Sequence, residues 1–453
     1  MLDTVSPRLV YRIQERLLKR PTFPYLEELE ETQWLPRDGL EGMQLEKLTA
    51  LVHLALRHSP WHAERIRRAG LDRRTGRLSF DDLRRLPTMT KPDARANIER
   101  IRWADVPGGG FAYNTGGSSG EPLAFYFGRW RQASDAAGRM RARRWWGVEP
   151  GEREVYLWGA PVELSKTDRI RTLRDRLLNQ LVLNAFEMSS RNMDAYLEAI
   201  ESFRPKCLYG YASSVALLAT RARERGIQMR LPELKVVCTT GEPLYPHQRE
   251  LIENVFGVPA ANEFGSRDIG FTAHETPAGQ MLLMSESILL EVLDAEGRPV
   301  APGELGEAVM TGLCSEAQPF IRYRTGDMVR LATEQCREGR GLHVIEEVVG
   351  RSTDFIVRAD GTIMHALSVI YVLRGVPGIA QFRFTQHTVR DFEVAVVTER
   401  GWNEASSRKI IAELAERLGK DARIEIRLVD GLAAEASGKF RYVVSHVKVG
   451  MAE

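Results

Sequence analysis

The stretch between Tyr113 and Pro122 combines glycines with hydroxyl side chains in a pattern that could bind a phosphate. It reads Tyr-Asn-Thr-Gly-Gly-Ser-Ser-Gly-Glu-Pro and precedes an alternating apolar run over residues 123–127. Glycine lets the backbone turn through positive φ, and successive backbone N–H groups in such a turn make an anion cradle. It is not the P-loop of kinases and GTPases, because Glu121-Pro122 stand where that motif has lysine and serine or threonine. Two interpretations stay open here, a phosphate-binding loop and a flexible surface loop.

Two further clusters place glycine beside carboxylates. Residues 239–244 read Thr-Thr-Gly-Glu-Pro-Leu and follow an expected strand at 234–238, and ligands of open α/β sheets bind outside the carboxyl ends of strands. Residues 262–270 read Asn-Glu-Phe-Gly-Ser-Arg-Asp-Ile-Gly. There the aromatic ring beside glycine could stack on a flat base, and Asp268 could hold Mg²⁺ shared with a phosphate. The alternatives are an ordinary strand–helix turn for the first cluster and a polar surface loop for the second.

Two more stretches carry isolated charges beside glycine. Residues 323–327 read Tyr-Arg-Thr-Gly-Asp, and Asp327 could accept hydrogen bonds from two neighbouring hydroxyls, as on a ribose. Residues 436–442 read Ala-Ser-Gly-Lys-Phe-Arg-Tyr, and Lys439 beside glycine is sterically open and could reach into a neighbouring cleft. The alternatives are a polar surface loop and a solvated lysine in a tail.

A basic group at residues 139–146 interleaves arginine with tryptophan, reading Arg-Met-Arg-Ala-Arg-Arg-Trp-Trp. Such a pattern can bind nucleic acid or a nucleotide tail, but it is more typical of a solvated helix face with aromatic anchors. The net charge of +2 gives no overall basic field, so we expect no nucleic-acid partner.

Composition is that of an ordinary globular protein. At 453 residues the chain is too long for a single core and should form two or more domains. The four cysteines are scattered without a C-x-x-C pair, as is usual in a reducing compartment. No apolar run approaches the roughly 18–20 residues of a transmembrane segment, and the first residues lack the pattern of a signal peptide. We therefore expect a cytoplasmic protein with no transmembrane segment.

The apolar periodicity predicts how these clusters are positioned. Residues 1–100 show helical spacing, and the first helix carries Arg8, Arg12 and Arg16, so it either caps the domain, which we favour, or lies on a membrane surface. Between 151 and 310 strand-like segments, such as 154–158, alternate with helix-like segments, such as 246–256, which indicates a largely parallel sheet. Residues 351–453 read as a small α+β unit. The prediction is an α/β fold with a large N-terminal domain (1–350, helical over 1–100) and a small C-terminal domain (351–453).

The order of these clusters resembles the adenylate-forming superfamily. The serine–glycine loop, Gly-Glu-Pro, aromatic-Gly-x-x-acid, Tyr-Arg-Thr-Gly-Asp, Gly-Arg-x-x-Asp and a C-terminal Gly-Lys follow one another along the chain. Within that superfamily the chain is similar to the phenylacetate–coenzyme A ligase and CapK-type branch, from Ser59-Pro60-Trp61 and Leu86-Pro87-Thr88 to Lys439. The resemblance implies a large domain with mixed and parallel sheets, and a small C-terminal domain that acts as a mobile lid.

The resemblance also implies an ATP-dependent, AMP-forming ligase. Such an enzyme adenylates a carboxylic acid, which could be aromatic, and then transfers the acyl group to coenzyme A. The implied cofactors are ATP and Mg²⁺, with coenzyme A as co-substrate. Two alternatives are an adenylating enzyme that uses an amine or another acceptor, and a non-catalytic nucleotide-binding scaffold. A homodimer is left open.

Roles for individual residues follow from the same resemblance. Lys439 would bridge the carboxylate and the phosphate during adenylation, Asp268 would contact Mg²⁺, Asp327 would bind the ribose hydroxyls, and Arg351 would lie at the hinge near the nucleotide. The pyrophosphate end of ATP would be held by Thr115, Gly116, Gly117, Ser118, Ser119 and Gly120. The adenine would be framed by Gly241, Glu242, Pro243, Glu263, Phe264 and Gly265.

The acyl pocket is expected near residues 158–159 and 209–212. Three positions depart from the pattern of the family: Asp268 replaces a glutamate, Thr353 replaces an aspartate at the hinge, and Glu121 replaces a lysine. These departures bear on the thioester step more than on the adenylate step.

Overall fold

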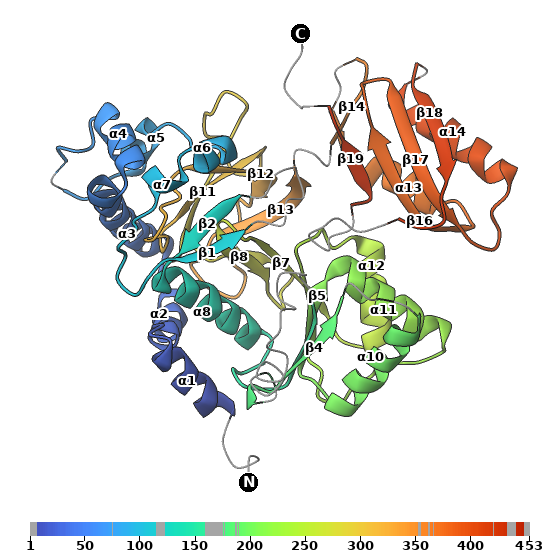
Figure 1. Cartoon of the computed structure of the whole chain (residues 1–453), viewed down its shortest axis with the longest axis horizontal. Helices are drawn as coiled ribbons and strands as arrows, with labels where there is room; N and C mark the ends of the chain where they lie inside the picture. The colour runs from blue at the N-terminus through green and yellow to red at the C-terminus, as the bar shows by residue number, and fades with distance from the viewer. Residues whose placement is uncertain are drawn as a thin grey trace. The chain divides into compact units, whose positions relative to one another are not determined.

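The computed structural model describes most of the chain as two compact units. The described residues are 7–74, 76–114, 123–158, 175, 177–185, 188, 190–351, 355–360, 363–365, 367–419, 421–432 and 441–447. One unit comprises residues 1–325 and 329–348, and the other comprises residues 326–328 and 349–453 (Figure 1).

The described residues between 7 and 101 form seven helices joined by loops. The helices are α1 (Pro7–Leu17), α2 (Thr22–Thr32), α3 (Arg37–His58), α4 (Pro60–Arg68), α5 (Phe80–Arg85), α6 (Lys91–Ala96) and α7 (Ile98–Ile101). Side chains of the N-cap residues fix several of these boundaries. Ser59 accepts a hydrogen bond from the backbone of α4, and reciprocal capping boxes join Ser79 to Asp82 and Thr90 to Asp93.

A hairpin and an eleven-stranded mixed sheet follow. Strands β1 (Phe111–Asn114) and β2 (Ala124–Phe127) pair antiparallel as the hairpin. The strands of the sheet are β3 (Glu154–Trp158), β4 (Gln180–Asn184), β5 (Cys207–Tyr211), β6 (Val236–Thr240), β7 (Ala260–Ser266), β8 (Gly270–Glu275), β9 (Met281–Leu283), β10 (Ile288–Leu293), β11 (Leu305–Gly312), β12 (Tyr323–Leu331) and β13 (Val344–Arg351). Their order is β10-β11-β12-β13-β9-β8-β7-β6-β5-β3-β4. From β4 to β7 the pairing is parallel, so the carboxyl ends of β5, β6 and β7 lie at one edge of the sheet.

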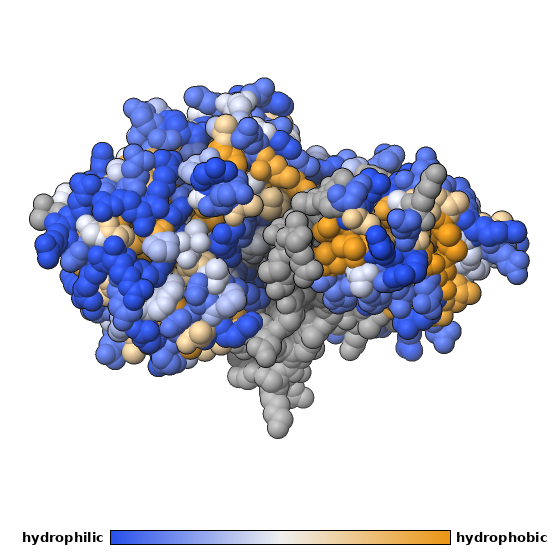
Figure 2. Space-filling view, turned by 90° about the horizontal axis from the view of Figure 1, so that it is seen from above, coloured by the Kyte–Doolittle hydropathy of each residue, from blue (hydrophilic) through white to orange (hydrophobic). Residues whose placement is uncertain are grey.

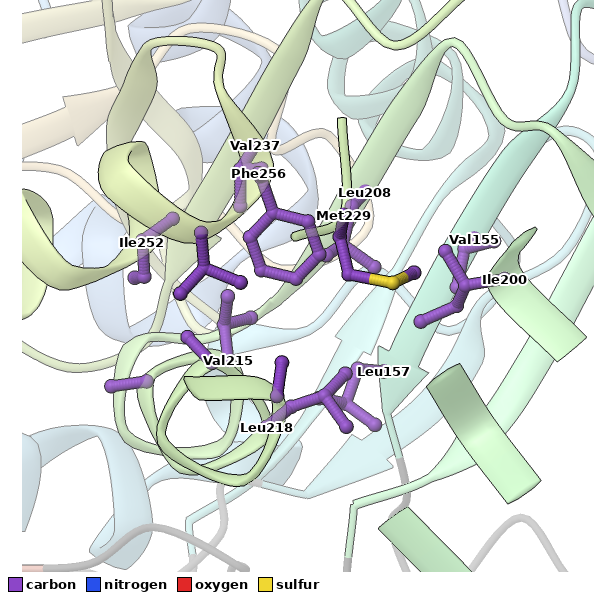
Figure 3. Packing of buried hydrophobic residues seen from close by; sticks show 14 of the residues in the cluster. Val155, Leu157, Ile200, Leu208, Val215, Leu218, Met229, Val237, Ile252 and Phe256 are labelled. Carbon is purple, nitrogen blue, oxygen red and sulfur yellow. The ribbon is translucent and has the colours of Figure 1, made fainter. Parts of the chain in front are cut away.

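One face of the parallel part packs against α10 (Ser190–Phe203), α11 (Ala212–Glu224) and α12 (Pro246–Phe256), which lie together beside β4 and β5 (Figure 1). Apolar residues of the strands and helices interlock there, as Figure 3 shows for Leu157 of β3, Leu218 of α11 and Phe256 of α12. The central parallel strands β5 and β6 are buried at every position, whereas β4 at the edge of the sheet exposes Val182.

Helix α8 (Arg129–Trp145) corrects one expectation from the sequence. Its basic residues were expected on a solvated face, but Arg141 is 0% exposed and Arg143 is 3% exposed. Arg141 forms an ion pair with Glu286, which is also fully buried, and donates to the carbonyl of Leu29 at 3.0 Å. Arg143 Nε lies 3.5 Å from Glu154 Oε2, so each buried guanidinium group has a carboxylate beside it.

The C-terminal unit is a small α+β structure. Its elements are β14 (Phe355–Val357), β15 (Ile363–His365), α13 (Leu367–Arg374), β16 (Ile379–Gln386), β17 (Asp391–Thr398), α14 (Glu404–Leu418), β18 (Arg423–Leu428) and β19 (Val443–Ser445). Four of these strands form a sheet in the order β18-β17-β16-β19. Its central pair, β16 and β17, is antiparallel.

The face of the molecule seen in Figure 2 is mainly hydrophilic, with apolar residues in separate small areas. Within the described part of the chain, no helix has the length and apolar character that a bilayer crossing requires.

Candidate active site

The turn that carries Asp268 joins the antiparallel strands β7 and β8. The pairing shifts register between Phe264 and Gly265, which makes a β-bulge just before the turn. A Cβ atom on Gly265 would lie 2.9 Å from the carbonyl oxygen of Gly270. Glycine is therefore required at position 265 because the two strands approach too closely for any side chain.

Asp268 accepts a hydrogen bond from Tyr323. The Tyr323 hydroxyl lies 2.7 Å from Asp268 Oδ2, and the Tyr323 side chain is 1% exposed at the start of β12. Two sequence clusters predicted to take part in nucleotide binding thus meet through side chains. The structure brings the Phe-Gly-x-x-Asp turn and the first residue of the Tyr-Arg-Thr-Gly-Asp stretch together.

Helix α8 holds the same turn from the other side. Arg131 donates to the carbonyl oxygens of Asp268 at 3.2 Å and Arg267 at 3.4 Å. Its Nε lies 3.0 Å from Asp135 Oδ2, and Asp135 Oδ1 accepts from the backbone N–H of Phe271 at 3.1 Å. The first two turns of α8 therefore fix the backbone that carries Asp268.

The Gly-Glu-Pro cluster lies at the carboxyl end of β6, where the sequence predicts a ligand-binding turn. Gly241 has φ +77°, a left-handed conformation that favours glycine. Glu242 Oε2 accepts a hydrogen bond from the backbone N–H of Ser213 at 2.9 Å, in the first turn of α11. A carboxylate at a helix N-terminus accepts from a backbone N–H that has no partner within the helix, and its charge complements the helix dipole. Glu242 thereby links the ends of β5 and β6, with Pro243 following it in the turn.

Glu263 is held beneath this edge of the sheet. Its Oε1 accepts from the hydroxyls of Tyr209 and Thr240, both at 2.9 Å, and the residue is 6% exposed. Burial raises the pKa of the Tyr209 hydroxyl, and the Glu263 carboxylate raises it further, so Tyr209 remains a donor. The neighbouring Arg139 and Tyr156 line a cavity of about 40 Å³, room for ordered water.

Phe264 points away from Glu263, as successive residues of a strand do. It packs against an apolar cluster that includes Phe125, Phe320 and Tyr323. Of the predicted adenine-framing residues, Glu263 and Phe264 therefore lie on opposite faces of β7.

Asp327 and Arg351 lie on the adjacent strands β12 and β13. Asp327 is 8% exposed and follows Gly326, which has φ +77°. Residues 326–328 group with the C-terminal unit. Arg351 is the last residue of β13.

The predicted phosphate loop, Thr115, Gly116, Gly117, Ser118, Ser119 and Gly120, lies outside the described residues, as do Glu121, Thr353 and Lys439. The chain on both sides of the loop is described, and Asn114 pairs with Ala124 in the β1–β2 hairpin. The ends of the loop are therefore adjacent.

The oxygens at Asp268 fit Mg²⁺. The carboxylate is only partly buried, and its Oδ1 forms no hydrogen bond with any described residue. Among those residues, no group of three or more His, Cys, Asp or Glu side chains gathers as a metal cage. Mg²⁺ commonly uses one or two carboxylates together with water and substrate phosphates, and a single aspartate suits that mode.

The sequence patterns did not indicate the two residues of α8 that position the turn, Arg131 and Asp135. The available signal was weak: arginine and aspartate four residues apart in a helix is a common surface pair. Their buried contacts depend on strands more than 100 residues away along the chain.

Comparisons with known proteins agree with this architecture. Residues 356–446 match the CapK C-terminal domain family. The chain is 22% identical to Protein CapK of Staphylococcus aureus over 437 residues, which cover 95% of this chain and 94% of that protein. It is 25% identical to a phenylacetate–coenzyme A ligase of Thermus thermophilus over 392 residues, 84% of each chain.

Among solved structures, the chain is similar to a 2-hydroxyisobutyryl-CoA ligase in the postadenylation state, in complex with R3-HIB-AMP. The TM-score is 0.70 at 21% identity, covering 91% of this chain and 90% of that one. An anthranilate CoA ligase in complex with anthranoyl-AMP matches with a TM-score of 0.50 at 18% identity, covering 72% of this chain and 65% of that one. These similarities confirm the predicted fold class.

Proposed function

We propose that this chain adenylates a carboxylic acid with ATP, releasing pyrophosphate, and passes the acyl group to coenzyme A. The chain has the fold of the adenylate-forming ligases and resembles CapK and the phenylacetate–coenzyme A ligases. Its similarity to phenylacetate–coenzyme A ligases extends over 84% of the chain in one case and 94% in another. The observation that carries the proposal is the Asp268–Tyr323 hydrogen bond, which joins two of the predicted nucleotide-binding clusters.

Adenylation brings an anionic carboxylate against the α-phosphate, so negative charge accumulates at the reacting atoms. Groups aimed at that charge lower the barrier electrostatically. In this proposal Lys439 supplies a positive charge and Asp327 orients the ribose. Asp268 would hold Mg²⁺, which neutralises phosphate charge when bound. Backbone N–H groups of the loop at residues 115–120 would bind the pyrophosphate end of ATP.

The remaining predicted residues organise the site around these groups. Glu242 caps α11 and so fixes the turn after β6, while Gly265 lets β7 and β8 approach closely. The adenine would lie against this turn. Arg351, at the end of β13, would take the hinge position beside the nucleotide.

A second candidate uses an acceptor other than coenzyme A, such as an amine. The match of residues 356–446 to the CapK C-terminal domain family favours it, as does the similarity to Protein CapK over 95% of the chain. Thr353, which replaces the hinge aspartate of the family, points the same way because the hinge serves the second step.

The test is acid-dependent exchange of labelled pyrophosphate into ATP, measured over a panel of aromatic and aliphatic acids. Exchange with at least one acid supports the proposal. Lys439→Ala should lower that exchange by about 10²–10³-fold. Lys409→Ala, at a lysine on α14 of the same unit whose side chain is 51% exposed, is the matched control and should retain it.

Consumption of the coenzyme A thiol then separates the two candidates. Exchange with thiol consumption supports the ligase, and exchange without it supports another acceptor. A folded protein that binds ATP but shows no exchange with any acid would be a nucleotide-binding scaffold.

A further inference from the structure

Helix α1 displays its apolar side chains outward. Leu9, Ile13 and Leu17 are spaced four residues apart, so they form one stripe along the helix. Their exposed fractions are 51%, 49% and 77%. A helix on the surface of a globular protein normally buries such a stripe, and here it faces solvent.

The opposite side of α1 is fixed against the protein. Tyr11 packs edge-on against Phe23 of α2, with ring centroids 5.8 Å apart. Glu15 is 2% exposed and accepts hydrogen bonds from Thr22 at 2.5 Å and Arg20 at 3.3 Å. Rotating α1 to bury its leucines would expose the tyrosine and break the contacts of a buried carboxylate, so the apolar stripe stays outside.

Basic residues flank the exposed stripe. Within α1 they are Arg8, Arg12 and Arg16, and Lys19 follows its end; all four are exposed. The acidic residue of α1, Glu15, is buried on the other side. Arg8 lies 3.8 Å from Glu149 and Arg12 lies 3.6 Å from Glu27. All four side chains are about half exposed or more, and such pairs contribute little. The outward face of α1 therefore combines apolar side chains with positive charge.

We propose that α1 attaches this protein peripherally to an anionic lipid bilayer. The helix would lie in the plane of the interface, with Leu9, Ile13 and Leu17 at the boundary of the acyl chains and Arg16 and Lys19 among the headgroups. Eleven residues give a helix about 16 Å long, suited to lying on a bilayer and too short to span one. This attachment is independent of the proposed catalytic activity.

Charge favours a membrane over a second copy of the chain as the partner. A twofold contact through α1 would bring two sets of arginines into one interface, where α1 exposes no carboxylate to meet them. An anionic bilayer supplies both the negative charge and the apolar layer. Each basic residue near such a surface strengthens attachment by about fivefold.

The experiment measures co-sedimentation of the full chain with vesicles of phosphatidylcholine alone and of phosphatidylcholine with phosphatidylglycerol. We expect partitioning to be at least about tenfold stronger on the anionic vesicles and to weaken with added salt. The triple variant Leu9→Gln/Ile13→Gln/Leu17→Gln should lose about tenfold or more. Arg16→Glu/Lys19→Glu should lose at least as much on anionic vesicles.

A matched control places the same substitutions on the other unit: Val389→Gln/Ile411→Gln/Leu428→Gln, where the side chains are 38%, 41% and 57% exposed. This variant should bind vesicles like the unmodified chain. Equal binding of the α1 variant and the control would overturn the proposal. The proposal would also be overturned if the chain did not bind vesicles and formed a dimer that the α1 substitutions convert to a monomer. In that case α1 would be a subunit interface.

Discussion

Tyr323 donates a 2.7 Å hydrogen bond to Asp268 Oδ2 across 55 residues of sequence. The tyrosine is 1% exposed and packs against Phe320, so its hydroxyl has a fixed position. With one carboxylate oxygen held in this way, the other is oriented for a metal ion or water without further loss of rotamer freedom. The hydrogen bond therefore fixes the orientation of the Asp268 carboxylate, the candidate metal ligand.

Replacing Tyr323 with phenylalanine should therefore lower activity more than stability. The ring and its packing remain, and the loss is one hydrogen bond worth about 1–2 kcal/mol. We expect pyrophosphate exchange to fall by about tenfold and the Mg²⁺ concentration that gives half-maximal exchange to rise. Titration of Mg²⁺ in the exchange assay checks this.

Asp268→Asn serves as the comparison, because it keeps the shape and removes the charge. It should lower exchange by about 10²-fold or more. If Tyr323→Phe behaves like the unmodified chain at every Mg²⁺ concentration, the hydrogen bond does not position the site.

Asp135 should be a positioning residue for the same turn. Its carboxylate accepts from Arg131 at 3.0 Å and from the backbone of Phe271 at 3.1 Å. Asp135→Ala removes both contacts and leaves the Arg131 guanidinium, 3% exposed, without its carboxylate. We expect a loss of about 2–4 kcal/mol in the free energy of unfolding and a lower kcat for exchange.

Asp135→Asn separates the two effects, since its amide oxygen can still accept one hydrogen bond. It should recover part of the stability and part of the kcat together. A variant with restored stability and no restored kcat would contradict a role for Asp135 in holding the turn.

The sequence predicted those elements whose pattern is local. The strand Glu154–Trp158 and the helix Pro246–Phe256 have the same bounds in prediction and structure. Alternation and a proline at the helix start are signals contained within each segment. The order of the clusters likewise indicated the fold, because each cluster could be read from neighbouring residues.

What the sequence could not predict depends on which strands become neighbours. The burial of Arg141 requires Glu286, 145 residues away, and the capping of α11 requires Glu242 from the following strand–helix turn. A run of arginines normally indicates a solvated face, and nothing within residues 139–146 marks the two that are buried. The sequence patterns therefore do not identify the distant residues that pair with charged groups, either in the core or in the site.

The Arg141–Glu286 pair provides a stability prediction. Both side chains are fully buried, and Arg141 Nη2 lies 3.1 Å from Glu286 Oε2. Glu286→Gln leaves a buried guanidinium without a counter-charge and should cost about 3–5 kcal/mol in the free energy of unfolding. Urea unfolding followed by tryptophan fluorescence measures the loss.

The double variant Arg141→Met/Glu286→Leu is the control, because it removes both charges while keeping apolar volume. It should be more stable than Glu286→Gln by about 1–3 kcal/mol, since a buried pair is often replaceable by apolar residues. If the double variant is less stable than the single one, the ion pair contributes more to the free energy of unfolding than the cancelling of two buried charges.

His62 should make the N-terminal helical region sensitive to acid. Its Nδ1 accepts from Arg65 Nη1 at 2.8 Å, and its Nε2 donates to the carbonyl of Pro319 at 2.9 Å. Burial, reinforced by the Arg65 charge, lowers the pKa of His62 from 6.5 to about 3. The unfolded chain therefore takes up this proton first as the pH falls, and stability present above pH 6.5 is lost progressively toward pH 3.

At pH 5.5 the loss from His62 alone should be about 1.4 kcal/mol relative to neutral pH. Other groups also titrate, so the measurement is the difference in urea-unfolding free energy between pH 7.5 and pH 5.5, compared with His62→Gln. Glutamine can accept from Arg65 or donate to Pro319 without titrating, so the variant should lose about 1.4 kcal/mol less over the same interval. An equal loss in both proteins would mean that His62 is not the acid-sensitive group, because its protonation would then be as favourable in the folded chain as in the unfolded one.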